Sequence, residues 1–344
     1  MTPPPATDQT RIGVDVGGTF TDVVLVVDGD RYTAKVPTTA DQSVGVLDGI
    51  KKACDDAGID PAAIDAFAHA MTVSVNALLE RNGAKTALVT TQDFRDVLEI
   101  ARQDRPALYD LDATKPDPLV PRSRRFEIDE RATTDGIEQP VDPGDVRDLA
   151  GDIAATDAES VAVCLLHAYA HPENEQRVAD SLREALDVPV SASHEVLPEF
   201  REFERTATTA VDAYVTPAIR GYLNRLTEKA TDAGVPEPRI MQANGGIADS
   251  ETVSDRAVST TLSGPAAGVV GAAATAAESD ATTAPSVVTF DMGGTSSDVS
   301  LVRDGQAERT TEAEIDGIPI RTPMVDVTTV GAGGGSVAWV DRGG

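Results

Sequence analysis

A duplicated segment constrains the fold of this 344-residue chain more than any other feature. Residues 12–27 and 288–303 share one pattern: an apolar run, an aspartate, two glycines, a threonine and a second apolar run. Asp15 corresponds to Asp291, and Asp22 corresponds to Asp298, with the glycines and the threonine in the same register between them. One glycine motif is weak evidence, but two copies a domain's length apart predict a duplicated architecture.

Each copy is predicted to form a β-hairpin with its glycines at the tip. The flanking runs are rich in β-branched residues, which is typical of strands, and a glycine pair is a turn signal. A glycine tip lets backbone N–H groups approach an anion closely, and neighbouring hydroxyl groups add donors. The predicted anion-binding residues are Gly17, Gly18, Thr19, Thr21, Gly293, Gly294, Thr295 and Ser296. The chain has no GxxxxGK[ST] P-loop.

An aspartate ends the first strand of each hairpin. We expect Asp15 and Asp291 to hold Mg²⁺ through water, because Mg²⁺ keeps much of its hydration shell. Two such hairpins facing each other would clamp the phosphates of one nucleotide. The alternative is a pair of ordinary hairpins with glycine turns, which leaves the repeated aspartate and threonine unexplained.

The charge of the chain restricts its partners and its environment. The net charge is −28, which argues against nucleic acid and anionic membranes as partners because like charges repel. The acidic residues are dispersed and only six of the basic residues are lysines, a composition that indicates adaptation to high salt. Residues 1–10 carry no signal pattern and are predicted to be a disordered tail. Cys54 and Cys164 are expected to be buried free thiols in a reducing cytoplasm.

Alternating strands and helices are predicted between the two hairpins, in the order expected of one half of a ribonuclease H-like protein. The expected strands are 31–36, 66–71, 85–90 and 160–166, and the expected helices are 44–58, 74–81, 143–155 and 173–186. The proline-rich segment 101–125 is either a functional loop, in which Arg102, Arg105 and Tyr109 bind an anionic substrate, or a solvated loop.

Two helices and a third glycine-rich loop are predicted in the second half. A long helix from 202 to 233 begins beside Arg201, Glu204 and Arg205, which form either a buried charge network or a solvated face. The helix at 262–277 has a face of small residues that would let another element approach closely, as between two halves that hinge; a plain packing helix is the alternative. Gly333 and Gly334 belong to a loop predicted to line the same phosphate cleft.

The hairpin pattern resembles the phosphate-binding hairpins of the actin/Hsp70/sugar-kinase superfamily. More specifically, the whole chain resembles the hydantoinase/oxoprolinase A family, which includes ATP-dependent N-methylhydantoinase A, 5-oxoprolinase and an acetone carboxylase subunit. The stretches that carry this resemblance are VDVGGTFTDVV, NALLERNGAKTALVTTQDFRDVLEIARQDRPALYDL, KPDPLVPR, EVLPEFREFERTATTAVDAYV, MQANGG, LSGPAAGVVGA, DMGGTSSDVSLV and TTVGAGGGSVAWVD. The resemblance implies an α/β, ribonuclease H-like ATPase fold whose second half is incomplete.

This resemblance implies a first ribonuclease H-like domain at 11–200, a connecting helical region at 201–284 and the start of a second domain at 285–344. Family members are usually longer, so we expect a chain supplying the missing C-terminal half, a hydantoinase B-type subunit, or both as partners. One motif departs from the family, because His69-Ala70-Met71-Thr72 stands where His-Gly-Thr-Thr is common. His69 is either catalytic or a satisfied core residue.

The implied activity is ATP-dependent opening of a small cyclic amide such as a hydantoin or 5-oxoproline, by phosphoryl transfer to the carbonyl oxygen followed by attack of water. Thr19, Thr295 and the glycine amides would hold the phosphates of ATP, and Asp15 and Asp291 would hold Mg²⁺ and act in catalysis. The alternatives are a sugar-kinase-like phosphotransferase of the same fold and an inactive nucleotide-binding fragment of a split gene.

Overall fold

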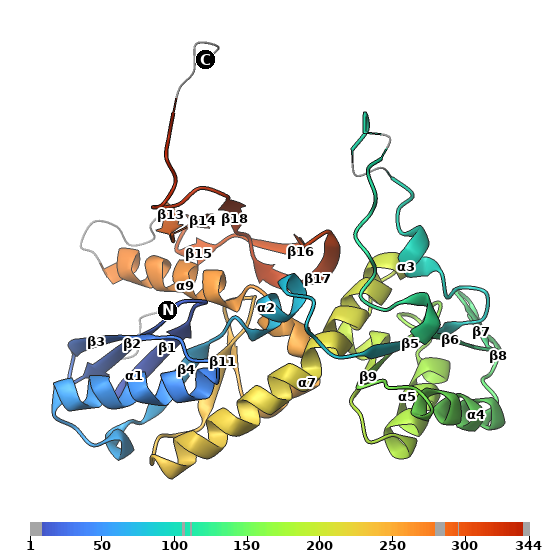
Figure 1. Ribbon diagram of the computed structural model, residues 1–344, viewed down its shortest axis with the longest axis horizontal. Helices are drawn as coiled ribbons and strands as arrows, with labels where there is room; N and C mark the ends of the chain where they lie inside the picture. The colour runs from blue at the N-terminus through green and yellow to red at the C-terminus, as the bar shows by residue number, and fades with distance from the viewer. Residues whose placement is uncertain (1–8, 105–106, 111, 279–285, 295, 340–344) are drawn as a thin grey trace.

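A six-stranded mixed sheet forms the first part of the molecule (Figure 1). The computed structural model describes residues 9–104, 107–110, 112–278, 286–294 and 296–339, so most of the predicted tail lies outside the described residues. The strand order is β12-β11-β4-β1-β2-β3, in which β4 and β11 run parallel to β1, and β2 runs antiparallel to its neighbours β1 and β3. The strands are β1 Arg11–Val16, β2 Phe20–Val27, β3 Asp30–Pro37, β4 Ala66–Ala70, β11 Pro238–Met241 and β12 Ile247–Ala248.

Two helices, α1 (Gln42–Ala57) and α7 (Glu202–Asp232), cover one face of this sheet and bury its main apolar core. The predicted helix end at Gly58 is confirmed, because Gly58 adopts a left-handed conformation with φ of 69° that ends α1. Shorter elements complete this part of the chain, namely η1 Pro61–Ala63, α2 Val73–Leu79, α8 Ser250–Asp255 and η3 Ala257–Thr260.

A second, fully parallel sheet has the strand order β10-β9-β5-β6. Its strands are β5 Thr86–Thr91, β6 Arg125–Ile128, β9 Ser160–Cys164 and β10 Val190–Ala192. Alternate residues of β5 and β9 pack against α4 (Pro143–Ala154) and α5 (Glu173–Ala185) on one face and against the first half of α7 on the other. The smaller elements here are α3 Val97–Ile100, η2 Arg122–Arg124, β7 Arg131–Thr133, β8 Gly136–Gln139 and α6 Ser193–Val196.

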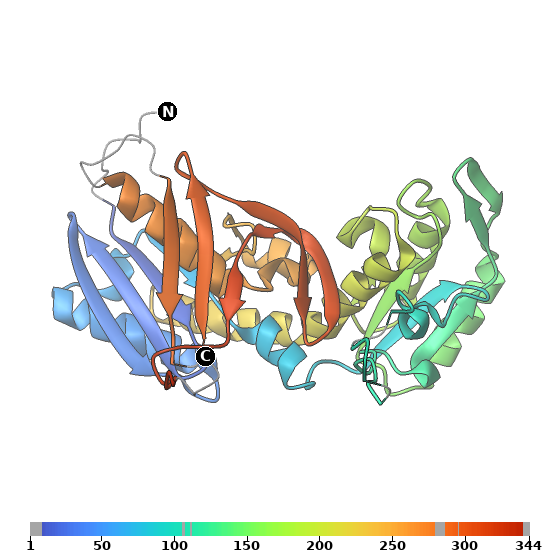
Figure 2. The same ribbon diagram turned by 90° about the horizontal axis from the view of Figure 1, so that it is seen from above.

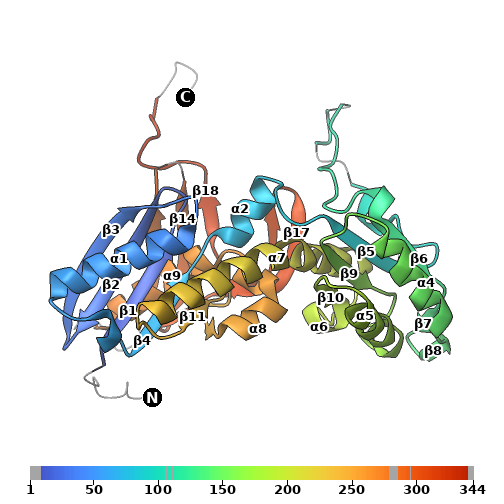
Figure 3. The same ribbon diagram turned by 60° about the horizontal axis from the view of Figure 1, so that its bottom comes forward.

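The strand predicted at 85–90 exists but does not continue the first sheet. The position beside β4 is taken by β11, which comes much later in the chain. Strand β5 pairs with β6 and β9 instead. A short buried apolar strand pairs equally well in either sheet, so its pattern does not specify its neighbours. Figure 3 shows that α7 runs along both sheets and joins them.

The second hairpin and the strands after it form the third part of the molecule. Strand β14 pairs with β13 on one side and with β15 and β18 on the other, while β16 and β17 form a separate hairpin. The strands are β13 Val287–Met292, β14 Ser297–Arg303, β15 Gln306–Ala307, β16 Arg309–Ile315, β17 Ile318–Val325 and β18 Thr328–Val330. Helix α9 (Ser263–Glu278) contacts β4 and β11 of the first sheet and β13 and β14 of the third (Figure 2).

Within the part of the chain that the structure describes, none of the helices combines the length and the apolar character needed to cross a lipid bilayer.

A substitution at Gly83, in the connection between α2 and β5, tests how tightly this connection packs against α7. A Cβ at this position would lie 2.2 Å from the Tyr214 ring, so we expect Gly83→Ala to lower the free energy of unfolding by about 2 kcal/mol. The matched control is Gly151 in α4, where a Cβ meets nothing within 4 Å. Gly151→Ala should raise stability by about 1 kcal/mol, because alanine is the better helix former. Chemical denaturation of both variants measures the difference, and equal stabilities would contradict the packing.

Candidate functional site

The two hairpins predicted from the duplicated segment are confirmed, and their tips are built alike. Asp15 stands opposite Asp22 across the first hairpin, and Asp291 stands opposite Asp298 across the second. In each tip the first glycine amide closes the turn: Gly17 N donates to Phe20 O at 2.9 Å and Gly293 N donates to Ser296 O at 2.9 Å. Thr295 lies outside the described residues.

The two repeated aspartates lie against neighbouring turns of helix α9. A Cβ on Gly264 would lie 3.9 Å from Asp15 Oδ1, and a Cβ on Gly268 would lie 3.5 Å from Asp291 Oδ2. These glycines are four residues apart and therefore occupy the same face of the helix. The small-residue face predicted for this helix thus receives the carboxylates of both hairpins. The sequence predicted a face of small residues on this helix, but it did not identify Gly264 or the carboxylate of Asp15 that lies near it.

The electrostatics of this pair favour a cation. Partial desolvation by its surroundings raises the pKa of Asp15, and the nearby charges of Asp22 and Asp291 raise it further, although Lys35 opposes them. Lys35 is itself bound to both carboxylate oxygens of Asp22, at 2.7 and 2.8 Å. Mg²⁺ fits this donor set, because it binds through one or two carboxylates and keeps several waters. The described residues contain no group of three or more His, Cys, Asp or Glu side chains arranged around one ion.

The tip of the first hairpin divides its predicted phosphate ligands into two groups. Gly18 and Thr19 are exposed, whereas Thr21 is buried beneath the tip, with its hydroxyl 3.4 Å from Thr38 Oγ1. Thr38 also donates from Oγ1 to Gly17 O at 2.8 Å and from its amide to Thr19 O at 2.9 Å. The structure therefore places Thr21 as a support of the tip. Thr38 was missed because a polar residue after a strand carries no specific signal.

The third glycine-rich loop packs on the tip of the second hairpin. Gly334 N donates to Gly293 O and Gly335 N to Gly294 O, both at 2.9 Å. A Cβ on Gly333 would lie 2.6 Å from Gly293 O, so only glycine allows this approach. The Gly333 amide donates to Ser336 Oγ, which means that the Gly333 and Gly334 amides are already engaged. The structure places these two residues as supports of the hairpin tip.

His69 lies in the core, on the face of the sheet opposite Asp15. It is 1% exposed, its Nδ1 lies 3.2 Å from Val14 O, and its Nε2 lies 2.7 Å from the Tyr222 hydroxyl. Since a carbonyl only accepts, Nδ1 carries the proton and Nε2 accepts from Tyr222. Burial lowers the pKa of His69 to about 4, so the imidazole is neutral. The structure therefore supports the core alternative for His69 and not its catalytic alternative.

The other residues singled out in the sequence lie away from the hairpin tips. Arg102 makes a bidentate ion pair with Glu204, at 2.8 and 2.6 Å, while Tyr109 is 95% exposed. Arg105 lies outside the described residues. The prediction that both cysteines are buried free thiols is confirmed.

Comparison with known proteins agrees with this architecture. The chain matches the family models for the hydantoinase/oxoprolinase N-terminal region over residues 11–186 and for hydantoinase/oxoprolinase over residues 205–344. The alpha subunit of caprolactamase from Pseudomonas jessenii is 35% identical over 344 residues, which cover 97% of this chain and 49% of that subunit. The 5-oxoprolinase of Saccharomyces cerevisiae is 32% identical, over 95% of this chain and 28% of that enzyme.

Two solved structures share the fold. The ATP-dependent caprolactamase of Pseudomonas jessenii matches with a TM-score of 0.86 and 34% identity, over 96% of this chain and 49% of that chain. Nucleotide-free acetone carboxylase matches with a TM-score of 0.82 and 27% identity, over 97% of this chain and 49% of that chain. The chain thus spans about half the length of these relatives, and the predicted α/β, actin/sugar-kinase-like ATPase fold is confirmed. The chain belongs to the hydantoinase/oxoprolinase family.

Proposed function

We propose that this chain forms the nucleotide-binding part of an ATP-dependent hydrolase that opens a small cyclic amide. The observation that carries the proposal is that Asp15 and Asp291 both approach the glycine face of α9, near Gly264 and Gly268. Supporting it, relatives of this family include an ATP-dependent caprolactamase and a 5-oxoprolinase, which act on cyclic amides. Hydantoins, 5-oxoproline and other lactams all remain candidate substrates.

The residues of this chain would act by positioning and by balancing charge. The exposed tip residues Gly18 and Thr19 would donate to phosphate oxygens, as backbone N–H groups at glycine turns do. Asp15 and Asp291 would hold Mg²⁺ through its water molecules, and the raised pKa of Asp15 suits it to orient the attacking water. Bound ATP supplies the phosphoryl group that turns the amide oxygen into a better leaving group.

The third sheet offers a surface for a partner chain. On β13 the side chains of Val288, Phe290 and Met292 alternate on one face and are all more than half exposed, an apolar row that is unusual on a free surface. Because the matched relatives are about twice as long, we propose that a chain supplying the remaining half, a B-type subunit, or both cover this face. Caprolactamase alpha is named as a subunit, which supports a multi-subunit assembly.

The domain division and the cellular setting are proposals of the same kind. We propose boundaries at residues 10, 200 and 284, and the connecting region at 201–284 contributes β11 and β12 to the first sheet. The free thiols of Cys54 and Cys164 suit a reducing cytoplasm, and the net charge of −28 suits a high-salt environment.

Calorimetric titration of Mg-ATP tests the proposal, on this chain alone and then with a polypeptide supplying the remaining half and a B-type subunit. We expect saturable binding in molar KCl, followed by lactam-dependent release of ADP from the assembly. Release that depends on a sugar would favour a phosphotransferase. Failure of the folded assembly to bind Mg-ATP would mean that the hairpins serve only as architecture.

A further inference from the structure

A pocket of about 370 Å³ lies where α7 begins, beside the loop that follows β9. Its walls include Arg102, Leu166, His167, Tyr169, Arg201 and Arg205, and we call it the arginine pocket. It lies at the end of α7 that packs on the second sheet, whereas the hairpin tips lie near the first sheet at the other side of the molecule (Figure 1). It is therefore separate from the proposed nucleotide cleft.

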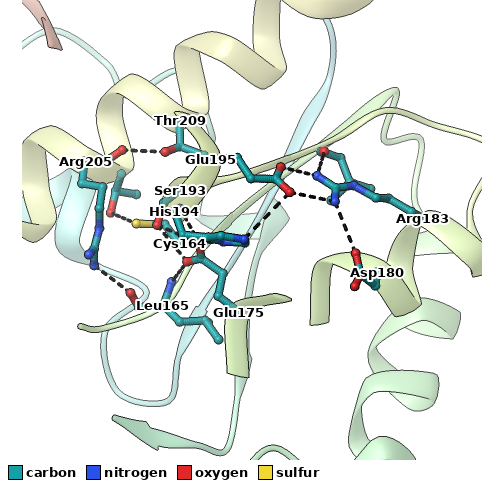
Figure 4. Close-up of polar contacts among 12 residues, drawn as sticks. Cys164, Leu165, Glu175, Asp180, Arg183, Ser193, His194, Glu195, Arg205 and Thr209 are labelled. Carbon is teal, nitrogen blue, oxygen red and sulfur yellow. Dashed lines mark hydrogen bonds and ion pairs between the residues drawn. The ribbon is translucent and has the colours of Figure 1, made fainter. Parts of the chain in front are cut away.

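Arg205 is a buried cation with unused donors. Its side chain is 1% exposed, and Nη2 donates to Leu165 O at 2.7 Å (Figure 4). Nε and Nη1 find no hydrogen-bond partner among the residues that the structure describes. The guanidinium lies 5.4 Å from the centre of the Tyr169 ring, which offers only a weak counter-charge. A buried charge normally has a hydrogen-bonded counter-ion, whereas Arg205 has none among the residues that the structure describes.

The nearest buried carboxylates are already occupied. Glu175 accepts from Leu165 N at 2.7 Å, from Ser193 Oγ and from both the amide and Nδ1 of His194 (Figure 4). Glu204 holds Arg102 through both carboxylate oxygens. Glu202 also lines the pocket, and its charge acts on both Arg102 and Arg205. Burial lowers the pKa of Arg205, but the charges of Cys164, Glu175 and Glu202 raise it overall. Among the described residues, none of these groups accepts a hydrogen bond from Nε or Nη1, so these two donors stay free for a ligand.

A second buried polar atom faces the same space. His167 Nδ1 is also buried and finds no hydrogen-bond partner in the described ranges. His167 and Arg201 both adopt left-handed backbone conformations, with φ of 54° and 81°, which glycine normally occupies. The N-terminal amides of the 31-residue helix α7 add a favourable dipole for an anion, and no side chain caps them. Three arginines therefore line one pocket of a chain whose net charge is −28.

We propose that the arginine pocket binds the carboxylate of a small organic acid. The charge of Arg205 and its free Nε and Nη1 donors select an oxyanion, and His167 adds a donor in the tautomer that carries the proton on Nδ1. Arg201 closes the pocket beside Phe200, with its guanidinium 5.2 Å from the ring centre. Leu166, Tyr169 and Phe200 provide apolar walls, and the volume exceeds that of an inorganic oxyanion. A carboxylic acid with a short hydrocarbon chain matches both the cationic side and the apolar walls of the pocket. This proposal does not depend on the proposed enzyme activity.

Isothermal titration of the full chain with isobutyrate tests the proposal, in a zwitterionic buffer with as little chloride as keeps the chain folded. We expect saturable binding of one isobutyrate per chain. Isobutyramide, its neutral isostere, should not bind, and inorganic phosphate should bind more weakly. No saturable isobutyrate binding, equal binding of the amide, or binding of phosphate alone would each overturn the carboxylate assignment.

Two variants locate the site. Arg205→Met should abolish isobutyrate binding. Arg201→Gly removes the second guanidinium and also relieves the left-handed backbone, so it should weaken binding at least about tenfold while Tm stays the same or rises. The control is Arg239→Ala, which removes an exposed arginine outside the pocket and should leave the affinity unchanged. Wild-type affinity in folded Arg201→Gly would place the binding elsewhere.

Discussion

Asp15→Asn is expected to abolish ATP hydrolysis by the assembled enzyme, lowering kcat by about a thousandfold or more. Asparagine keeps the shape of the side chain but removes the negative charge that would hold Mg²⁺ through water. It also removes the repulsion from Asp22 and Asp291 that raises the pKa of Asp15. The folded chain should therefore be as stable as the wild type or more stable.

Steady-state ADP release and thermal unfolding, measured on the same preparations, separate loss of chemistry from loss of fold. The control is Asp48→Asn, which changes the charge equally at an exposed position of α1. Normal turnover in Asp15→Asn would refute the assignment of the hairpin cleft. A large drop in Tm would show that Asp15 is structural instead.

His69 should make the stability of the protein fall in mild acid. Its pKa is about 4 in the folded protein and 6.5 in the unfolded chain, so between these values the unfolded state binds the extra proton. This contribution is fully present above the unfolded pKa and is lost as the pH falls toward the folded pKa. Between pH 7 and pH 5 the loss amounts to about 2 kcal/mol of unfolding free energy.

Urea denaturation at several pH values measures this loss. All of these pH values lie above the sequence pI of 4.3, because the chain would precipitate near its pI. The other acidic groups also titrate, so the comparison is with His69→Gln, which retains a polar side chain but has no proton to gain. The wild type should show the steeper decline in acid. Parallel pH profiles for the two proteins would mean that His69 is protonated in the folded state, in conflict with its burial against Tyr222.

The local features of the hairpins could be predicted from sequence because they depend on neighbouring residues. Gly17 and Gly293 specify the turns, and the alternating runs on either side specify the strands. The end of α1 at Gly58 follows from the same kind of short-range rule. Asp15 and Asp291 could be recognised together as candidate Mg²⁺ ligands only because the segment around them is duplicated in the sequence.

What could not be predicted depends on residues distant along the chain. The environment of His69 is decided by Tyr222, 153 positions away, so its residue type alone left both alternatives open. The place of β11 beside β4 is decided by packing on α7, which no apolar pattern specifies. Likewise, Thr21 looks like an exposed ligand until Thr38 is seen to approach it. The free donors of Arg205 could be recognised only after the described residues around it had been placed.

Helix α7 makes the two sheets depend on each other thermodynamically. Val215 and Leu226 belong to the core of the first sheet, whereas Ala207 and Ala210 of the same helix belong to the core of the second. Neither sheet keeps a complete core if α7 unwinds, so the two should lose their structure in one cooperative event. A ligand that binds only beside the first sheet would then protect the second sheet from unfolding by mass action, without touching it.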